Sequence, residues 1–154
     1  MPHTTFDHLH THVNVTITAN IHVRDIPLRH SLYQTVVLEL DENLLRGSLP
    51  NVFTRLTNLR RIRLDENNLT GRLPPSWGAL TALTLLTFHT NQFSGSLGAF
   101  DLAGLRNLLV LWGSNNELTG TVPSAVGRLT NLREWRKEVE HGWQQQLQQL
   151  RPTH

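Results

Sequence analysis

LELDENLLRGSLP (residues 38–50), IRLDENNLTGRLP (62–74), LTFHTNQFSGSLG (86–98) and LWGSNNELTGTVP (111–123) are four versions of one segment. Their first residues are 24, 24 and 25 positions apart. A unit of this length cannot bury its own apolar face, so successive units stack and share a core. The sequence therefore predicts a solenoid with one extended surface, which suits binding better than catalysis.

The units align slot by slot, and each slot has a physical reason. Alternating apolar residues place one side of a short strand in the core and the other in solvent, and the period makes such strands parallel neighbours. A recurrent Asn can satisfy buried backbone groups where the chain leaves the strand, and a recurrent Gly permits a conformation that a Cβ would block. We expect strands near residues 37–41, 61–65, 85–89 and 110–114. The apolar slots hold Leu38, Ile62, Leu86 and Leu111, then Leu40, Leu64, Phe88 and Gly113; the Asn slot holds Asn43, Asn67, Asn91 and Asn116, with Asn20 in a weaker unit; the Gly slot holds Gly47, Gly71, Gly95 and Gly120.

This pattern resembles the leucine-rich repeat, and the segments LTGRLP and LTGTVP are similar to its plant-specific class, found in ectodomains of receptor-like kinases and in polygalacturonase-inhibiting proteins. The resemblance implies an α/β solenoid: a right-handed superhelix with a concave parallel β-sheet and short helical or 3-10 segments on the convex side. It also implies a protein or peptide ligand and descent from a receptor-like protein, of which this chain is then a fragment or an intracellular relative.

The third unit departs from the others. It carries Gly98 where its neighbours carry proline, and one extra residue precedes Leu105. We expect Phe100 or Leu102 to take the place that Trp77 has in the second unit. A tolerated insertion on the convex side is the simplest interpretation.

The chain divides into four segments: a polar, His-rich leader (1–14), a degenerate unit or cap (15–37), the four repeats (38–132), and a C-terminal segment (133–154). In the degenerate unit Val15 and Ile17 alternate and Asn20 follows; the alternative is a hairpin that turns at Ala19-Asn20. The C-terminal segment has apolar residues at steps of three or four, which predicts an amphipathic capping helix, and a disordered Gln-rich tail is the alternative. That apolar series is Leu132, Trp135, Val139, Trp143, Leu147 and Leu150.

Composition narrows the function. The formal net charge is +2, and no basic run with interleaved aromatic residues is present, so nucleic acid is not an expected partner. There is no Cys, no apolar leader core and no run of 18 apolar residues, so we expect neither secretion nor membrane insertion by this chain as written, and its compartment stays open. Asn14 and Asn68 begin glycosylation motifs that matter only in a secreted protein.

Catalysis and metal binding have weak support. His8, His10 and His12 alternate, as in the first strand of metal-dependent hydrolases, but only His89, His141 and the C-terminal His154 remain beyond residue 31 to complete a site, so we expect a solvated leader and no metal or cofactor. The carboxylates Asp41, Glu42, Asp65 and Glu66 could be a catalytic set. They recur at the same slots of two units, which indicates outward strand positions instead.

The outward positions form the predicted ligand site. Trp112 is its expected anchor, because aromatic residues dominate binding energy, and the acidic residues are expected to steer a partner. A module that only self-associates through its coil ends is the alternative. The predicted concave positions are Glu39, Asp41, Glu42, Arg61, Arg63, Asp65, Glu66, Thr87, His89, Trp112, Ser114 and Asn115.

Overall fold

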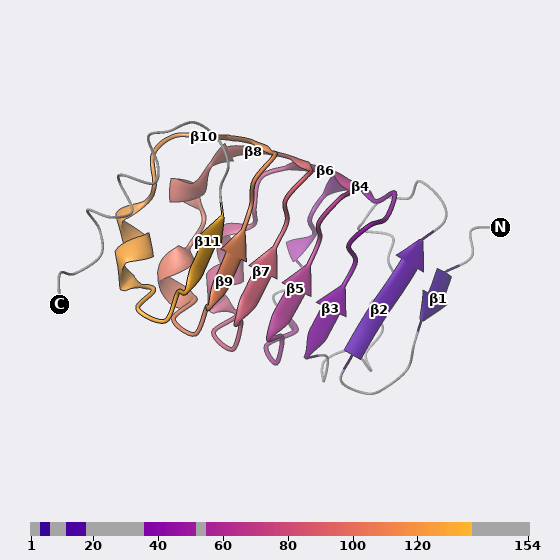
Figure 1. The fold of residues 1–154 in the computed structure, drawn as a ribbon, viewed down its shortest axis with the longest axis horizontal. Helices are drawn as coiled ribbons and strands as arrows, with labels where there is room; N and C mark the ends of the chain where they lie inside the picture. The colour runs from indigo at the N-terminus through magenta and orange to yellow at the C-terminus, as the bar shows by residue number, and fades with distance from the viewer. Residues whose placement is uncertain (1–3, 7–11, 18–35, 52–54, 137–154) are drawn as a thin grey trace.

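The computed structural model describes residues 4–6, 12–17, 36–51 and 55–136. These residues wind into successive coils, and each coil adds a strand to the larger of two sheets (Figure 1). That sheet consists, in spatial order, of β1 (Thr4–Phe6), β2 (His12–Ile17), β3 (Val37–Glu39), β5 (Arg61–Arg63), β7 (Leu85–Thr87), β9 (Val110–Trp112) and β11 (Glu134–Arg136). All neighbours except β1 and β2 are parallel.

The four predicted strands are present, each two residues shorter than expected. Register pairs Leu38 with Ile62, Ile62 with Leu86, and Leu86 with Leu111, so the first apolar slot forms one row. Inter-coil hydrogen bonds nevertheless continue past the strand ends, for example from Glu42 N–H to the Asp65 carbonyl (2.9 Å) and from Glu66 N–H to the His89 carbonyl (3.0 Å). The residues after each strand therefore keep the same alignment between coils.

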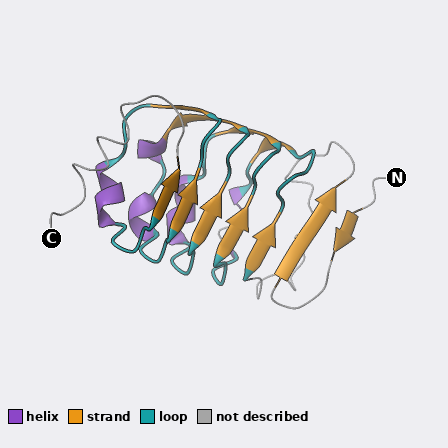
Figure 2. Cartoon of the chain, viewed as in Figure 1, coloured by secondary structure: helices purple, strands orange, loops and turns teal. Residues whose placement is uncertain are grey.

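A smaller parallel sheet and short 3-10 helices complete each coil (Figure 2). The sheet consists of β4 (Arg46–Ser48), β6 (Asn68–Gly71), β8 (Gln92–Ser96) and β10 (Glu117–Thr119). The helices are η4 (Pro75–Ala79), η5 (Leu97–Ala99), η6 (Leu102–Gly104) and η7 (Ser124–Arg128). They lie on the side opposite the larger sheet, which we call the convex side.

The extra residue of the third unit splits its convex helix into η5 and η6. Leu102 accepts a hydrogen bond from Leu105 N–H (3.0 Å), as Trp77 does from Leu80 N–H (2.9 Å). Leu102 therefore takes the slot of Trp77. Phe100, only 3% exposed, is an additional core residue.

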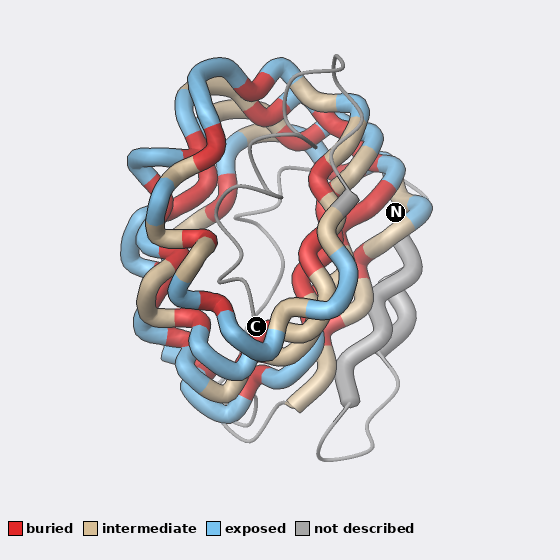
Figure 3. Tube along the Cα trace, turned by 60° about the vertical axis from the view of Figure 1, so that its left-hand side comes forward, coloured by how far each residue is buried: buried red, intermediate tan, exposed pale blue. Residues whose placement is uncertain are grey.

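The core is one continuous column of apolar side chains, and buried positions recur along every described coil of the repeat region (Figure 3). Leu38, Ile62 and Leu86 are fully buried and Leu111 is 3% exposed. Burying one such side chain contributes about 1.5–3 kcal/mol. Stacking thus supplies the stability that no single unit has.

Gly113 replaces the leucine of its slot because a phenylalanine fills the space. A Cβ at Gly113 would lie 2.4 Å from Cζ of Phe88, the residue in the same slot one coil earlier. The Phe88 ring also packs edge-on against Phe93, with ring centroids 5.7 Å apart. The large ring of Phe88 therefore occupies the space that a side chain at position 113 would need.

The Asn slot joins each coil to the one before it. Asn67 Oδ1 accepts from Leu45 N–H (3.0 Å), and Asn67 Nδ2 donates to the Leu40 carbonyl (2.8 Å) of the preceding coil. Asn91 repeats both bonds with Leu69 N–H (2.9 Å) and the Leu64 carbonyl (2.8 Å). Asn116 does the same with Phe93 N–H and the Phe88 carbonyl, whereas Asn20 lies outside the described residues. The column fixes how the chain turns inward after each strand.

The N-terminal segments differ from the expected boundary at residue 14. β2 begins at His12 and pairs in parallel with β3, with Val13 rather than Val15 opposite Leu38. β1 pairs antiparallel with β2, and the connection between these two strands precedes His12. The alternative turn at Ala19-Asn20 lies outside the described residues. The alignment through Asn20 was therefore shifted by two residues at the strand.

The helix expected over residues 133–154 does not begin there. Residues 134–136 form β11, parallel to β9, with Trp135 opposite Leu111. Arg133 N–H and Glu134 N–H both bond the Leu109 carbonyl (2.8 and 3.0 Å), as Leu109 and Val110 bond that of Thr84. The coil pattern thus continues for one more strand, and the remainder of the predicted helix lies outside the described residues.

Candidate functional site

The solvent side of the larger sheet, which we call the concave face, presents aligned columns of side chains. Register sets Glu39, Arg63, Thr87 and Trp112 side by side on β3, β5, β7 and β9. Neighbouring strands lie about 4.8 Å apart, so each side chain lies beside those of the coils before and after it. The interactions on this face therefore form mainly between side chains of adjacent coils.

The residue that precedes each Asn of the Asn slot has a left-handed backbone conformation, although it is not glycine. Glu42, Glu66, Thr90 and Asn115 have φ values of 53°, 54°, 54° and 52°. All four are exposed. Asparagine tolerates this conformation, whereas a β-branched residue such as Thr90 is strained in it. The turn aims these four side chains into solvent beside the concave face.

Asp65 is the centre of a polar cluster on the concave face. Its Oδ2 accepts from Thr87 Oγ1–H (2.5 Å), and its Oδ1 accepts from His89 N–H (3.1 Å). Nε2 of His89 lies 3.5 Å from Oδ1, and Nε of Arg63 lies 3.9 Å from Oδ2. Arg63 also forms an ion pair with Asp41 (3.1 Å). One carboxylate thus has partners from its own coil and the next.

Burial dominates the ionisation of Asp65. Its side chain is 6% exposed, and the loss of water raises the pKa of this carboxyl. The Thr87 hydrogen bond opposes this rise most strongly, followed by the charge and backbone N–H of His89 and the charge of Arg63. The net pKa remains above the ordinary value, so the ionised form costs folding free energy.

Beside this cluster lies a partly exposed apolar strip. Leu85 and Val110 are half-buried in the column next to that of Trp112. The Trp112 ring lies against the His89 ring, with centroids 6.4 Å apart and planes tilted by 41°. The concave face therefore combines an aromatic side chain, aliphatic neighbours and an imidazole within two coils.

The predicted ligand positions divide into exposed and internal groups. Asp65 and Thr87 are 4% and 2% exposed and bond each other beneath the surface, so these two predicted positions present little surface to a ligand. The positions that remain open or half-open are Glu39, Asp41, Glu42, Arg61, Arg63, Glu66, His89, Trp112, Ser114 and Asn115.

Three residues of this face were not among the predicted ligand positions. Leu85 and Val110 are half-buried outward positions of β7 and β9. Thr90 Oγ1 lies 3.2 Å from Nδ1 of His89, so it belongs to the polar cluster. For all three residues, the alignment of the repeats into columns indicates an outward position.

Of the leader histidines, only His12 lies within the described residues, where the register pairs it with Val37. His12 begins β2, and His8 and His10 lie outside the described residues. Within the described ranges, no three His, Asp or Glu side chains are grouped as metal ligands. In the same ranges no helix is long and apolar enough to cross a membrane.

Comparison with known proteins agrees with this geometry. The family described as Leucine Rich Repeat matches residues 58–80. The Arabidopsis receptor kinase HAESA, solved with the peptide hormone IDA and the co-receptor SERK1, is 33% identical over 66% of this chain and 17% of its own, with a TM-score of 0.62. A search of curated proteins gave no match.

Two further structures share the fold at lower identity. The ectodomain of the receptor kinase SOBIR1 from Arabidopsis thaliana is 24% identical over 86% of this chain and 76% of its own, with a TM-score of 0.64. A plant ice-binding protein is 23% identical over 85% of this chain and 45% of its own, with a TM-score of 0.68. At these identities the likeness concerns the fold alone.

The repeats, the parallel sheet and the Asn column define a leucine-rich-repeat solenoid. The chain belongs to the plant type of that family, the type of the receptor kinase ectodomains. It spans 17% of the hormone receptor RGFR1 and 18% of the TDR receptor, so it corresponds to a small part of either.

Proposed function

We propose that this chain is a non-catalytic binding module that recognises a protein or peptide segment on its concave face. The observation that carries the proposal is the half-buried Trp112, held against His89 and next to Leu85 and Val110. An aromatic side chain with aliphatic neighbours provides the kind of partly desolvated anchor that dominates binding energy.

The likeness to ligand-bound receptors supports a protein or peptide as the ligand. HAESA was solved with a peptide hormone and a co-receptor, and RGFR1 with RGF2. Peptide recognition by a small part of such an ectodomain requires a face whose side chains are already held in place, because ordering them on binding costs affinity. The contacts among Asp65, Thr87 and His89 supply that order here.

The polar half of the face adds charge. Glu42 and Glu66 are exposed on adjacent coils, and neither forms an ion pair with another residue in the described ranges. Exposed charges at the rim of a binding surface mainly accelerate association. We therefore assign steering to these two glutamates in place of Asp65.

The test begins with peptides selected against the folded chain from a random dodecamer library. Trp112→Ala should weaken the selected peptide by about 2 kcal/mol or more, about thirtyfold in Kd, and Trp112→Phe should weaken it less. Glu42→Lys with Glu66→Lys should change the association rate and its salt dependence. Circular dichroism and urea unfolding would establish that each variant remains folded.

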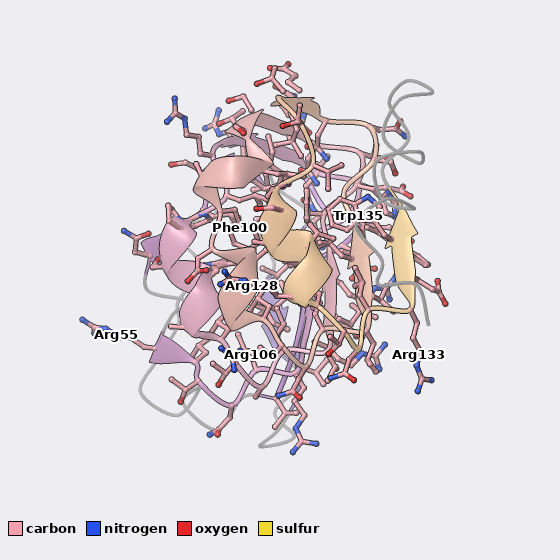
Figure 4. All side chains as sticks on the ribbon, turned by 90° about the vertical axis from the view of Figure 1, so that its left-hand side faces the viewer. Arg55, Phe100, Arg106, Arg128, Arg133 and Trp135 are labelled. Carbon is pink, nitrogen blue, oxygen red and sulfur yellow. The ribbon has the colours of Figure 1, made fainter. Side chains whose placement is uncertain are left out.

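Matched controls lie on other surfaces. Arg55→Ala alters an exposed convex side chain, which Figure 4 shows on the side of the solenoid away from Trp135 of the larger sheet. Leu44→Ala removes a large apolar side chain that is 51% exposed outside the concave columns. If these controls abolish binding while Trp112→Ala does not, the ligand surface has been assigned to the wrong face.

A further inference from the structure

The two lateral edges of the solenoid differ in charge. The turns that lead into β5, β7, β9 and β11 hold five arginines and no acidic residue, whereas the turns after β3, β5, β7 and β9 hold five acidic residues and no arginine or lysine. The former turns are residues 55–60, 79–84, 104–109 and 128–133, and the latter are residues 41–45, 65–69, 89–93 and 114–118. Because these strands are parallel, charges of one sign collect along each edge.

Four of the five arginines form one surface, which we call the basic edge: Arg60, Arg106, Arg128 and Arg133. All four are exposed. Figure 4 shows three of them, Arg106, Arg128 and Arg133, below Trp135, whereas Arg55 points outward on the convex side. Arg60 and Arg133 directly precede β5 and β11, so they occupy the same slot three coils apart, about 14 Å at the usual strand spacing.

Side chains that bond the backbone fix the basic edge from coil to coil. The Thr84 hydroxyl donates to the Arg60 carbonyl (2.8 Å), and Asn131 Nδ2 donates to the Arg106 carbonyl (3.0 Å). The backbone of these two arginines is therefore held by the following coil, while their side chains remain exposed. A partner does not have to order this backbone on binding, which lowers the entropic cost of association.

The positive charge of the basic edge is not neutralised within the described part of the chain. None of its four arginines forms an ion pair with another described residue. The acidic residue next to it in sequence, Glu134, starts β11 in the column of Val110 on the concave face. Of the 14 lysine and arginine residues of the chain, only Lys137 is a lysine, and a guanidinium presents a planar fork that matches a carboxylate.

The other side chains of the edge narrow the kind of anion. Its turns contain no aromatic residue on which a nucleic acid base could stack. Among the described residues the only large, exposed apolar side chain is Leu44, which lies on the opposite edge, so the basic edge has none to insert into a lipid surface. Thr84, Asn107 and Asn131 are engaged with backbone carbonyls. The edge therefore offers mainly guanidinium groups, which favours carboxylates as the ligand groups.

A second copy of this chain is a poorer partner than a foreign acidic segment. The opposite edge of that copy would have to supply the negative charge, but Asp41 and Asp65 there already lie 3.1 and 3.9 Å from the guanidinium nitrogens of Arg63. Asp65 is also buried. Arg46 and Arg72 add exposed positive charge shortly after the first two of those turns.

We propose that the basic edge is a second interaction surface of this chain, which binds an extended polypeptide segment rich in Asp or Glu that runs across the coils. The distance of about 14 Å from Arg60 to Arg133 corresponds to about four residues of extended chain. None of the four arginines is among the predicted concave positions, so this surface does not depend on the concave face.

The test measures the binding of a fluorescein-labelled decaglutamate peptide by fluorescence anisotropy. Arg106→Gln combined with Arg133→Gln should raise the Kd about fourfold to twenty-five-fold, because each exposed ion pair contributes about twofold to fivefold. Binding by the original chain should weaken as the salt concentration rises, since the interacting charges are exposed. Glutamine keeps the backbone carbonyl that Asn131 bonds, and circular dichroism with urea unfolding would show that the variant remains folded.

The matched control is Arg46→Gln combined with Arg72→Gln, which removes the same charge from exposed positions outside the basic edge. It should change the Kd by less than about twofold, because salt screens charges at that separation. Equal losses from the two double variants would show that only net charge matters and would overturn the proposal. Tighter edge-dependent binding of an oligonucleotide or an anionic polysaccharide, or self-association of the chain that the edge variant abolishes, would also overturn it.

Discussion

Replacing Asn67 by alanine tests the column that holds the coils together. Asn67 Oδ1 accepts from Leu45 N–H (3.0 Å), and its Nδ2 is within reach of the carbonyls of Leu40, Leu64 and Asp65 at 2.8, 3.2 and 3.0 Å. The side chain is buried, since Asn67 is only 8% exposed. Truncation therefore affects four backbone groups that water does not readily reach.

The four backbone groups do not all lose their last hydrogen-bond partner. The Leu40 carbonyl still accepts from Asn43 Nδ2 (3.1 Å), the Leu64 carbonyl from Asn91 Nδ2 (2.8 Å), and the Asp65 carbonyl from Glu42 N–H (2.9 Å). Only Leu45 N–H loses its acceptor outright. One orphaned buried donor costs about 1–3 kcal/mol, so we expect a loss of that size and not several times more.

Urea and thermal unfolding measure this loss. At about 2–4 °C per kcal/mol for a domain of this size, the melting temperature should fall by about 2–12 °C, with an unchanged denaturant slope. The matched control is Asn107→Ala, because Asn107 also bonds the preceding coil, through Nδ2 to the Thr81 carbonyl (2.9 Å), but is exposed. It should cost less than about 1 kcal/mol. Equal effects of the two substitutions would refute the argument that burial of Leu45 N–H sets the cost.

Three further substitutions test other parts of the structure. Gly113→Ala places a Cβ 2.4 Å from Phe88 Cζ and should cost about 1–3 kcal/mol; Phe88→Leu in the same chain should recover part of that loss, and additive costs in urea unfolding would contradict the shared packing. Thr90→Asn relieves a β-branched residue at φ 54° and should raise stability by about 1 kcal/mol, whereas Asn115→Thr at φ 52° should lower it by a similar amount. Asp65→Asn tests the raised pKa of that carboxyl: the folded state binds this proton more tightly than the unfolded state, so its contribution is complete below the unfolded pKa and is lost as pH rises through the folded pKa. Unfolding free energies measured against pH should therefore fall in that window for the original chain relative to the Asn variant, and parallel profiles would contradict the assignment.

The sequence predicts the repeated parts of this fold well because the evidence for each slot is independent in each coil. A period of 24 or 25 residues and the spacing from strand to Asn place β3, β5, β7 and β9 without any other information. The Gly slot is explained in the same way: Gly71, Gly95 and Gly120 have φ values of 81°, 83° and 82°. Because each slot occurs in several repeats, one atypical residue does not change the predicted position of a strand or turn.

The ends are harder because a terminal coil has a neighbour on one side only. Asn131-Leu132 repeats the Asn107-Leu108 that precedes β9, so the start of β11 was readable. The steps from Leu132 to Trp135 to Val139 fit a helix equally well, so the residues alone do not distinguish a strand from a helix at this end. At the N-terminus Val13 and Val15 both alternate with polar residues, and only pairing with β3 distinguishes the two registers.

The concave face shows why residues of one slot need not share one role. Asp41 and Asp65 both occur in the sequence Leu-Asp-Glu-Asn, yet their side chains are 16% and 6% exposed. The difference originates one coil later. Opposite Asp41 the next coil supplies Arg63, a charge that reaches out to solvent, whereas opposite Asp65 it supplies Thr87 and His89, whose donors enclose the carboxylate. A repeat unit therefore acquires its chemistry from residues about 24 positions away. Binding positions in such a solenoid therefore have to be predicted from the columns that cross the coils. The residues of one coil determine how its chain turns, whereas the residues of the next coil determine the partners of its outward side chains.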